Sequence, residues 1–484
     1  MSTSYATATA KRSIAHIVVD LDGTLVLTDT FFATLLEVVK KRPSQIFALI
    51  LALCRGRAEC KRLAASLACL DVRSLPYNEP LLKYLSQQRA AGARLVLATA
   101  ADESIAQKVA DHLGIFDDVL ASGNGRNVKG SEKVCAIREL IGEAPFSYAG
   151  NSRADVKVWR EADAAILVDA PKSCERQLRR AGVSVQRRFA GGRWNLKALL
   201  RCLRCHQWSK NVLVFLPLVA SHKLMDLRLT WLAAVAFFAL SFCASALYIV
   251  NDLLDLQADR LHPTKKRRPL AAGALSIPAG LGLALLMAIS ASALAFLLPV
   301  QASLLLVAYA AASLLYSLKL KQLLFVDVVS LALFYAFRVF YGGAVTGIRI
   351  SVWTLAFSLF LFASLAIVKR LTELRKANAE SAGALAYRGY RGADADHLSS
   401  LAAAGGYVSV LVLALYINSP EVQLLYRRPQ GLWLLCPVLI YWISRLTLLA
   451  NRGELHDDPV TFALKDFNTW VTGLMGGIII LLST

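Results

Sequence analysis

Three aspartates stand where a long apolar stretch gives way to charged residues. Asp252, Asp255 and Asp259 follow the run ALYIV, and their spacing places them on one face of a continuing helix. Ionised carboxylates at the end of a membrane span repel one another, and each costs about 2.5 to 3.5 kcal/mol if drawn to the middle of a bilayer. Their clustering predicts a compensating cation. Mg²⁺ is the natural candidate, because it prefers oxygen ligands and can bridge carboxylates to a diphosphate.

A basic group follows directly and changes how the aspartates are interpreted. Taken alone, the aspartates could be a solvated helix end, and the cations an anchor on one side of the membrane. Together, carboxylates and cations can hold a metal diphosphate from both sides. The cations, which precede Pro269, are Lys265, Lys266, Arg267 and Arg268.

The chain that must position these groups divides into a soluble part and a membrane part. Of its 484 residues 56% are hydrophobic, and its mean hydropathy of +0.49 is too high for an ordinary soluble protein. Long uncharged stretches recur only from Val212 onward. Nine spans are expected, a short one extended from 212–221 and eight near 229–250, 274–297, 301–318, 323–345, 352–368, 398–418, 430–450 and 467–483.

Loop charges predict the orientation of these spans. With the N-terminal part in the cytoplasm, loops 251–273, 316–322, 369–397 and 451–466 lie on the same side. They carry most of the Lys and Arg residues of the membrane part, as cytoplasmic loops do. Because this distribution accounts for much of the net charge of +20, we expect no nucleic-acid partner.

The membrane part resembles a known superfamily. The string NDLLDLQADRLHPTKKRRPLAAG looks like the motif of the UbiA-type intramembrane prenyltransferases, whose fold is nine transmembrane helices around a central cavity. Segments HQWSKNVLVFLPL, YSLKLKQLLFVDVVSLALFYAFRVFYGG, KRLTELRK and RGELHDDPVTFALKD are similar to one branch, the polyprenyl(decaprenyl)-phosphate phosphoribosyltransferases. The resemblance covers roughly residues 200 to 484 and implies a bacterial inner (plasma) membrane enzyme of cell wall biosynthesis.

This resemblance implies residue roles. Asp252, Asp255 and Asp259 would hold Mg²⁺ and the donor diphosphate, with Asp252 and Asp255 as catalytic residues and Asn251 orienting the first carboxylate. A lipid phosphate is already an anionic nucleophile, so it needs positioning against C1 of the ribose rather than a general base. The implied phosphate ligands are Lys210, Lys265, Arg267, Tyr316, Lys319, Lys321, Lys369 and Arg370.

One departure bears on the substrate. Many superfamily members carry a second aspartate cluster, whereas this chain has only Asp327, with Glu373 and the pair Asp457 and Asp458 elsewhere. The alternative, transfer of a polyprenyl chain from its diphosphate to an aromatic acceptor, usually needs that second cluster. Asp327 and Arg338 lie in one apolar span, where ionisable groups are either functional or paired within the bundle.

The N-terminal part has the pattern of an α/β domain. SIAHIVVDLDGTL predicts a strand followed by Asp20 and Asp22, at the edge where open α/β sheets bind ligands. Three further elements hold, in order, Thr99 (ARLVLATAAD), Lys129 and Lys133 (NVKGSEK) and Asp155 (FSYAGNSRADVKVW).

This ordered set resembles the haloacid dehalogenase-like (HAD) superfamily over about residues 13 to 190. The resemblance implies Asp20 as the nucleophile that forms an aspartyl-phosphate and Asp22 as the general acid and base. Thr99 and Lys133 would bind phosphate, and Asp155 would hold Mg²⁺ with Asp20. Asn151 stands where many members have an acidic metal neighbour, so a degenerate domain kept for stability or regulation is the alternative.

We therefore expect a multidomain chain. Residues 1–190 would form a Rossmann-like α/β HAD domain with a helical cap at about 30–90, followed by a basic amphipathic linker at 191–208. Residues 209–484 would form an all-α membrane bundle. The apolar run QIFALILALC is too short to span and would pack in the cap or touch the membrane surface.

The expected function is Mg²⁺-dependent transfer of a 5-phosphoribosyl group to a polyprenyl phosphate, with a possible phosphatase step on the product. The partners would be the lipid bilayer, a polyprenyl lipid substrate, and phosphoribosyl diphosphate or a prenyl diphosphate. The alternative outside enzymology is a scaffold or transporter whose N-terminal domain senses phosphate metabolites.

Overall fold

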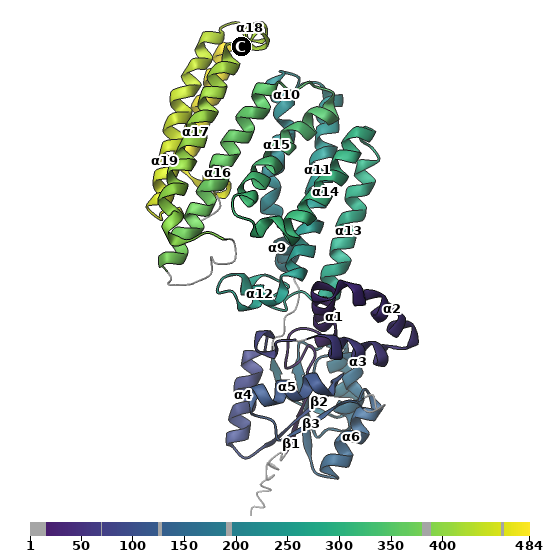
Figure 1. Cartoon of the computed structure of the whole chain (residues 1–484). Helices are drawn as coiled ribbons and strands as arrows, with labels where there is room; N and C mark the ends of the chain where they lie inside the picture. The colour runs from purple at the N-terminus through teal and green to yellow at the C-terminus, as the bar shows by residue number, and fades with distance from the viewer. Residues whose placement is uncertain (1–15, 69, 124–127, 190–195, 380–388, 456–458) are drawn as a thin grey trace, which may run out of the picture. The chain divides into compact units, whose positions relative to one another are not determined.

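The N-terminal part is built on a parallel sheet (Figure 1). The computed structural model describes residues 16–68, 70–123, 128–189, 196–379, 389–455 and 459–484. Six strands pair in the order β3-β2-β1-β4-β5-β6. They are β1 His16–Val19, β2 Arg94–Asp102, β3 Asp118–Ser122, β4 Phe146–Gly150, β5 Ala164–Val168 and β6 Ser184–Phe189.

The central strands are apolar because both of their faces are covered. β5 is buried at every position, as is β4, which is typical of parallel sheets flanked by helices. The strand order reverses at β1: β2 and β3 are added on one side of it, and β4 to β6 on the other. In open parallel sheets ligands bind in the crevice at such a switch point. The connecting helices are α4 Glu79–Ala90, α5 Glu103–Leu113, α6 Ser131–Ile141, α7 Val156–Glu161 and α8 Lys172–Arg180.

A small cap is inserted after β1. It consists of α1 Thr30–Lys41, α2 Ile46–Arg55 and α3 Arg57–Leu67, which share a hydrophobic cluster of their own. The Asp29 side chain starts α1 by accepting hydrogen bonds from the first backbone amides. Helix α4 instead packs with the strands, since Tyr84 contacts Phe189 of β6. Residues 30–67 thus hold the three helices of this cluster, and the bounds of about 30–90 for the cap stay a prediction.

The remainder of the described chain is helical. Its longer helices are α9 Leu196–Leu203, α11 Leu227–Leu254, α13 Ile277–Ala295, α14 Val300–Leu318, α15 Val326–Thr346, α16 Val352–Ala379, α17 Ala395–Ile417, α19 Leu435–Asn451 and α21 Phe467–Ser483. Shorter helices join them: η4 Cys205–Phe215, α10 Leu216–Ala220, α12 Leu256–Leu261, η5 Lys265–Arg267, η6 Leu320–Gln322, η8 Gly392–Asp394, α18 Pro420–Leu425, η9 Pro429–Leu434 and α20 Pro459–Lys465. Residues 190–195 of the predicted linker lie outside the described residues.

Seven helices in the described part are long and apolar enough to cross a membrane, and the chain is an integral multi-pass membrane protein. They correspond to the predicted spans from 229–250 to 430–450. The predicted last span is α21, an apolar helix of 17 residues. The predicted first span is the 3-10 helix η4 followed by α10. The count of nine therefore stays a prediction.

Two local predictions need correction. The loop predicted at 369–397 begins later, because α16 continues to Ala379, so Lys369 and Arg370 lie within a helix. The aspartate helix is not continuous: α11 ends at Leu254, and Asp255 separates it from α12. Backbone hydrogen bonds from Asp255 to Asn251 (2.9 Å) and from Asp259 to Asp255 (2.8 Å) nevertheless keep the helical spacing.

Candidate active sites

The first site forms around the loop that follows β1. The backbone N–H of Asp20 donates to the carbonyl oxygen of Ala149 on β4 at 3.0 Å, which fixes the carboxylate at the strand ends. Gly23 has a φ of +74°, and a Cβ there would come within 2.0 Å of the Asn151 side-chain nitrogen. The backbone angle therefore favours glycine at this turn, and a side chain there would displace the amide of Asn151.

A buried chain of hydrogen bonds joins the acidic residues of this site. Lys133 Nζ donates to Asp20 Oδ1 at 2.8 Å and to the hydroxyl oxygen of Tyr148 at 2.9 Å. The Tyr148 hydroxyl in turn donates to Asp155 Oδ1 at 2.8 Å. The structure thus places Lys133, rather than the exposed Lys129, against the predicted nucleophile.

Burial changes the pKa values of the two carboxyl groups in the loop after β1. It raises the pKa of Asp20 to about 6, against the opposing effect of Lys133. Burial raises the pKa of Asp22 to about 7, and Asp29 contributes in the same direction. Asp22 also accepts a hydrogen bond from the backbone N–H of Thr30 at 2.8 Å, so the cap holds it in place. A carboxyl group that titrates near neutrality can both donate and accept a proton.

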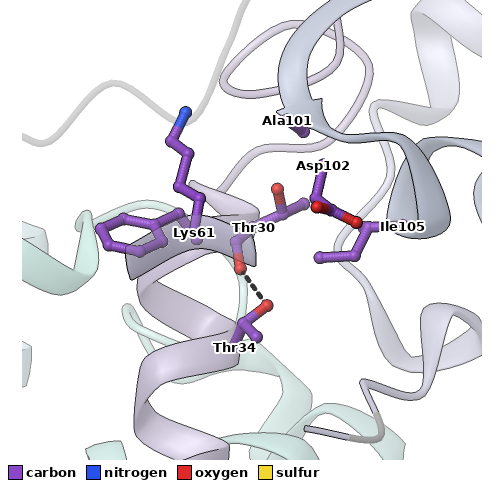
Figure 2. A pocket seen from close by; sticks show the side chains of 7 residues that line it. Thr30, Thr34, Lys61, Ala101, Asp102 and Ile105 are labelled. Carbon is purple, nitrogen blue, oxygen red and sulfur yellow. Dashed lines mark hydrogen bonds between the residues drawn. The ribbon is translucent and has the colours of Figure 1, made fainter. Parts of the chain in front are cut away.

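The predicted phosphate ligand Thr99 lies within β2, is 1% exposed, and accepts a hydrogen bond from the Ala101 N–H through its hydroxyl at 3.0 Å. A pocket opens beside it between cap and sheet, lined by residues that include Thr30, Lys61 and Asp102 (Figure 2). Lys61 Nζ donates to the carbonyl oxygen of Ala100 at 2.9 Å. The cap therefore brings a cation next to the part of β2 that follows Thr99.

The donor set of this site suits Mg²⁺ in part. Asp20 supplies a carboxylate and Asn151 an amide oxygen, both hard ligands. Asp155 is 4% exposed, and its Oδ2 already accepts from the backbone N–H and the hydroxyl of Ser152 at 2.9 and 2.7 Å. Within the described ranges no three His, Cys, Asp or Glu side chains gather as a metal site. Asp155 as a ligand stays a prediction.

The second site forms at the end of α11. Arg268 Nη1 contacts Asp252 Oδ1 at 2.9 Å and Asp259 Oδ2 at 2.5 Å, and both aspartates are buried. These two carboxylates therefore reach a single cationic atom, a geometry that a divalent ion could also use. Asp255 is half-buried, and its predicted role as a metal ligand stays a prediction. Asn251, Lys265 and Arg267 lie on the same stretch, and their predicted roles stay predictions.

Arg260 is the unusual residue of this stretch. It is 8% exposed, and none of its three guanidinium nitrogens has a hydrogen-bond partner among the described residues. Burial lowers its pKa to about 10. Because a buried charge without a partner is unfavourable, the arrangement is suited to receive an anion.

Other predicted phosphate ligands occupy separate elements of the bundle. Lys210 on η4 lies over the Tyr335 ring at 5.6 Å. The segment that carries it is fixed by Asn211, which donates to Ser241 at 3.0 Å and accepts from Arg338 at 2.8 Å. The remaining ones are Tyr316 on α14, Lys319 at its end, Lys321 on η6, and Lys369 and Arg370 on α16.

Asp327 and Arg338 do not pair with each other. Asp327 is fully buried and binds Arg370 Nε at 2.5 Å and the Tyr390 hydroxyl at 2.8 Å. Arg370 also contacts Glu373 at 2.6 Å. Arg370 is thus part of a satisfied ion pair, and its role as a phosphate ligand stays a prediction. Asp457 and Asp458 lie outside the described residues.

Several site residues escape detection from the sequence. Tyr148 lies inside a buried strand, Lys61 on a polar cap helix, and Arg260 next to the aspartate motif. No sequence spacing identifies Tyr148 or Lys61 as a site residue. Arg260 could have been suspected, since an arginine adjoining a carboxylate stripe at a span end needs a partner.

Family comparisons agree with this division into two sites. Residues 212–472 match the UbiA prenyltransferase family. Residues 17–160 match the haloacid dehalogenase-like hydrolases.

Individual relatives cover different portions of the chain. An uncharacterized protein of Sinorhizobium fredii, y4nM, is 35% identical over 95% of this chain and 89% of its own length. A decaprenyl-phosphate phosphoribosyltransferase of Mycobacterium tuberculosis is 30% identical over 55% of this chain and 88% of its own length. The structure of a UbiA homolog from Archaeoglobus fulgidus bound to GPP and Mg²⁺ is 16% identical, with a TM-score of 0.43, over 58% of this chain and 99% of its own.

Proposed function

The chain belongs to the UbiA prenyltransferase family and carries a haloacid dehalogenase-like domain ahead of it, and from this premise we propose that it transfers a 5-phosphoribosyl group from phosphoribosyl diphosphate to a polyprenyl phosphate. The family makes it a membrane transferase with a hydrolase-like domain. The phosphoribosyl donor is supported by the similarity of residues in the membrane part to a decaprenyl-phosphate phosphoribosyltransferase.

The observation that carries the proposal is the neighbourhood of α12. Asp252 and Asp259 converge on one cationic atom of Arg268, and Arg260 next to them is buried without a partner. Carboxylates that reach one cation, together with an unpaired guanidinium on the same stretch, supply the charges that a receptor for a metal-bound polyphosphate would need. Asp252 and Asp259 would hold Mg²⁺, which when bound supplies positive charge to the departing diphosphate.

The residues of this site would act by positioning and by charge. Arg260 would bind a phosphate group of the donor and orient the ribose. An oxygen of the lipid phosphate then forms a bond to C1 of the ribose, while the bond between C1 and the diphosphate oxygen breaks. The incoming phosphate is already ionised, so no residue has to remove a proton.

We propose that the HAD domain removes the 5-phosphate from the lipid-linked product or from a related sugar phosphate. The Asp20 carboxylate attacks phosphorus, and Asp22 protonates the departing sugar oxygen. Water then attacks the aspartyl-phosphate, with Asp22 accepting its proton, and inorganic phosphate leaves. Lys133 donates a hydrogen bond to Asp20 and would bind the transferred phosphate. We place this domain in the cytoplasm and the spans in a bacterial inner membrane.

The donor can be tested directly. Purified protein with Mg²⁺ and a polyprenyl phosphate is incubated with labelled phosphoribosyl diphosphate or, in parallel, with labelled prenyl diphosphate and an aromatic acceptor. Label that enters the lipid phase from phosphoribosyl diphosphate, and is lost in Asp252→Ala, supports the proposal. Incorporation only from prenyl diphosphate would replace it, and cellular lipids unchanged by Asp252→Asn would favour a scaffold or transporter.

A further inference from the structure

Helix α2 of the cap has more apolar surface than the cap can bury. Leu49 and Ala52 are 6% and 5% exposed and pack into the hydrophobic cluster that α2 shares with α1 and α3. These two residues are enough to dock the helix. Every residue from Ile46 to Cys54 is nevertheless apolar.

The apolar surface of α2 that the cap does not bury lies on the opposite face of this helix. Phe47, Ile50 and Leu51 are 82%, 54% and 56% exposed, and Cys54 is exposed as well. Their spacing of three and four residues places all four on one stripe of the helix. Leu53, beside this stripe, is 52% exposed. We call this stripe of Phe47, Ile50, Leu51 and Cys54 the α2 face.

Basic residues flank the α2 face at both ends of the helix. Lys40 and Arg42 are exposed just before it, and Arg55 is exposed at its last position. Lys41 is held by Glu37, with 2.6 Å between Nζ and Oε1. An apolar stripe with cations at its borders is complementary to a surface that is apolar inside and anionic at its rim.

We propose that the α2 face lies in the headgroup region of an anionic lipid bilayer. The helix has 10 residues, too few to cross a bilayer but enough to lie in the plane of its surface. Seven helices in the described part of the same chain are long and apolar enough to cross a membrane, so the HAD domain is tethered near lipid and meets it at a high effective concentration. This inference does not depend on the identity of donor or acceptor.

The test uses two exposed cysteines of the native chain as probe and control. Cys54 lies on the α2 face, and Cys135 lies on α6 of the same domain. Full-length protein in nanodiscs that contain phosphatidylglycerol is treated with a charged maleimide or with a lipid-soluble one. Labelling of each cysteine is followed by peptide mass spectrometry and normalised to the unfolded protein.

The expected result is that the charged reagent labels Cys54 about tenfold or more slowly than Cys135, while the lipid-soluble reagent labels Cys54 readily. Equal labelling of both by the charged reagent would show a face open to water and overturn the proposal. Protection of Cys54 from both reagents would indicate a protein contact, such as a second copy, and would also overturn it.

Charge reversal tests the lipid class. In the triple variant Lys40→Glu, Arg42→Glu, Arg55→Glu, or in nanodiscs made only of phosphatidylcholine, labelling of Cys54 by the charged reagent should rise toward that of Cys135. These side chains are exposed, and thermal unfolding with unchanged labelling of Cys135 verifies the fold. Persistent protection of Cys54 in both would refute the anionic requirement.

Discussion

Replacement of Arg260 by methionine should separate stability from donor binding. The guanidinium of Arg260 is buried and has no hydrogen-bond partner in the described part of the chain, so in the ligand-free protein it contributes an uncompensated desolvation penalty. Methionine fills a similar volume without charge. Arg260→Met should therefore unfold at the same temperature as the wild type or at a higher one.

The same variant, Arg260→Met, should bind the donor more weakly than the wild type. A hydrogen bond to a charged group contributes about 1.5 to 3 kcal/mol, so loss of the contact between guanidinium and phosphate should lower kcat/KM for phosphoribosyl diphosphate by about 10- to 100-fold. If Arg260 acts mainly in the ground state, most of this loss appears in KM.

A matched control comes from an arginine that has its partner. Arg445 contacts Asp466 through two hydrogen bonds, at 2.6 and 3.0 Å. Arg445→Met should lower the unfolding temperature and leave KM for the donor unchanged. Both variants are compared by thermal unfolding in detergent and by steady-state transfer of labelled ribose into lipid. An Arg260→Met protein with wild-type kcat/KM, or one destabilised like Arg445→Met, would refute the assignment of Arg260 as an anion receptor.

Four further outcomes are expected. Tyr148→Phe removes the hydroxyl between Lys133 and Asp155 and should lower the phosphatase kcat about 10- to 100-fold without changing the fold, as measured by phosphate release. An unchanged kcat and an unchanged pH profile would exclude this positioning role of Tyr148. Phosphatase activity should fall as the pH rises above about 7, because Asp22 then loses the proton that it gives to the departing sugar oxygen. Activity that stays constant across this range would contradict the assignment. Asn151→Asp should lower the Mg²⁺ concentration that gives half-maximal phosphate release, because it adds a carboxylate. If that Mg²⁺ concentration stays the same or rises, Asn151 is not a neighbour of the metal. Asp327→Asn should destabilise the detergent-solubilised protein by up to about 3 to 5 kcal/mol, because the buried Arg370 then keeps, among the described residues, only the half-buried Glu373 as a carboxylate partner. Wild-type thermal stability would contradict this.

The sequence predicts well those features that depend on local pattern. The strands before Asp20, around Thr99 and before Asn151 are apolar runs with polar residues at their ends, and the structure has β1, β2 and β4 there. Seven of the spans follow from the length of uncharged stretches alone. Such features need no knowledge of distant contacts.

Local sequence patterns do not predict features that depend on partners far away in the chain. Arg370 and Asp327 are 43 residues apart in the sequence, and neither segment has a local pattern that predicts their buried contact. The break at Asp255 divides a helix whose hydrogen-bond spacing continues. The role of Tyr148 likewise depends on Lys133 from another element. In each case burial and pairing, rather than periodicity, determine where the side chain lies.

The most direct measurement of the central claim follows two labels of the donor into lipid. Phosphoribosyl diphosphate is labelled with ¹⁴C in the ribose and ³²P in the 5-phosphate, and is incubated with a polyprenyl phosphate and Mg²⁺. The account predicts ¹⁴C without ³²P in the lipid for the wild type, both labels for Asp20→Asn, and neither for Asp252→Ala. Folded wild-type protein that leaves the lipid free of ¹⁴C would contradict it.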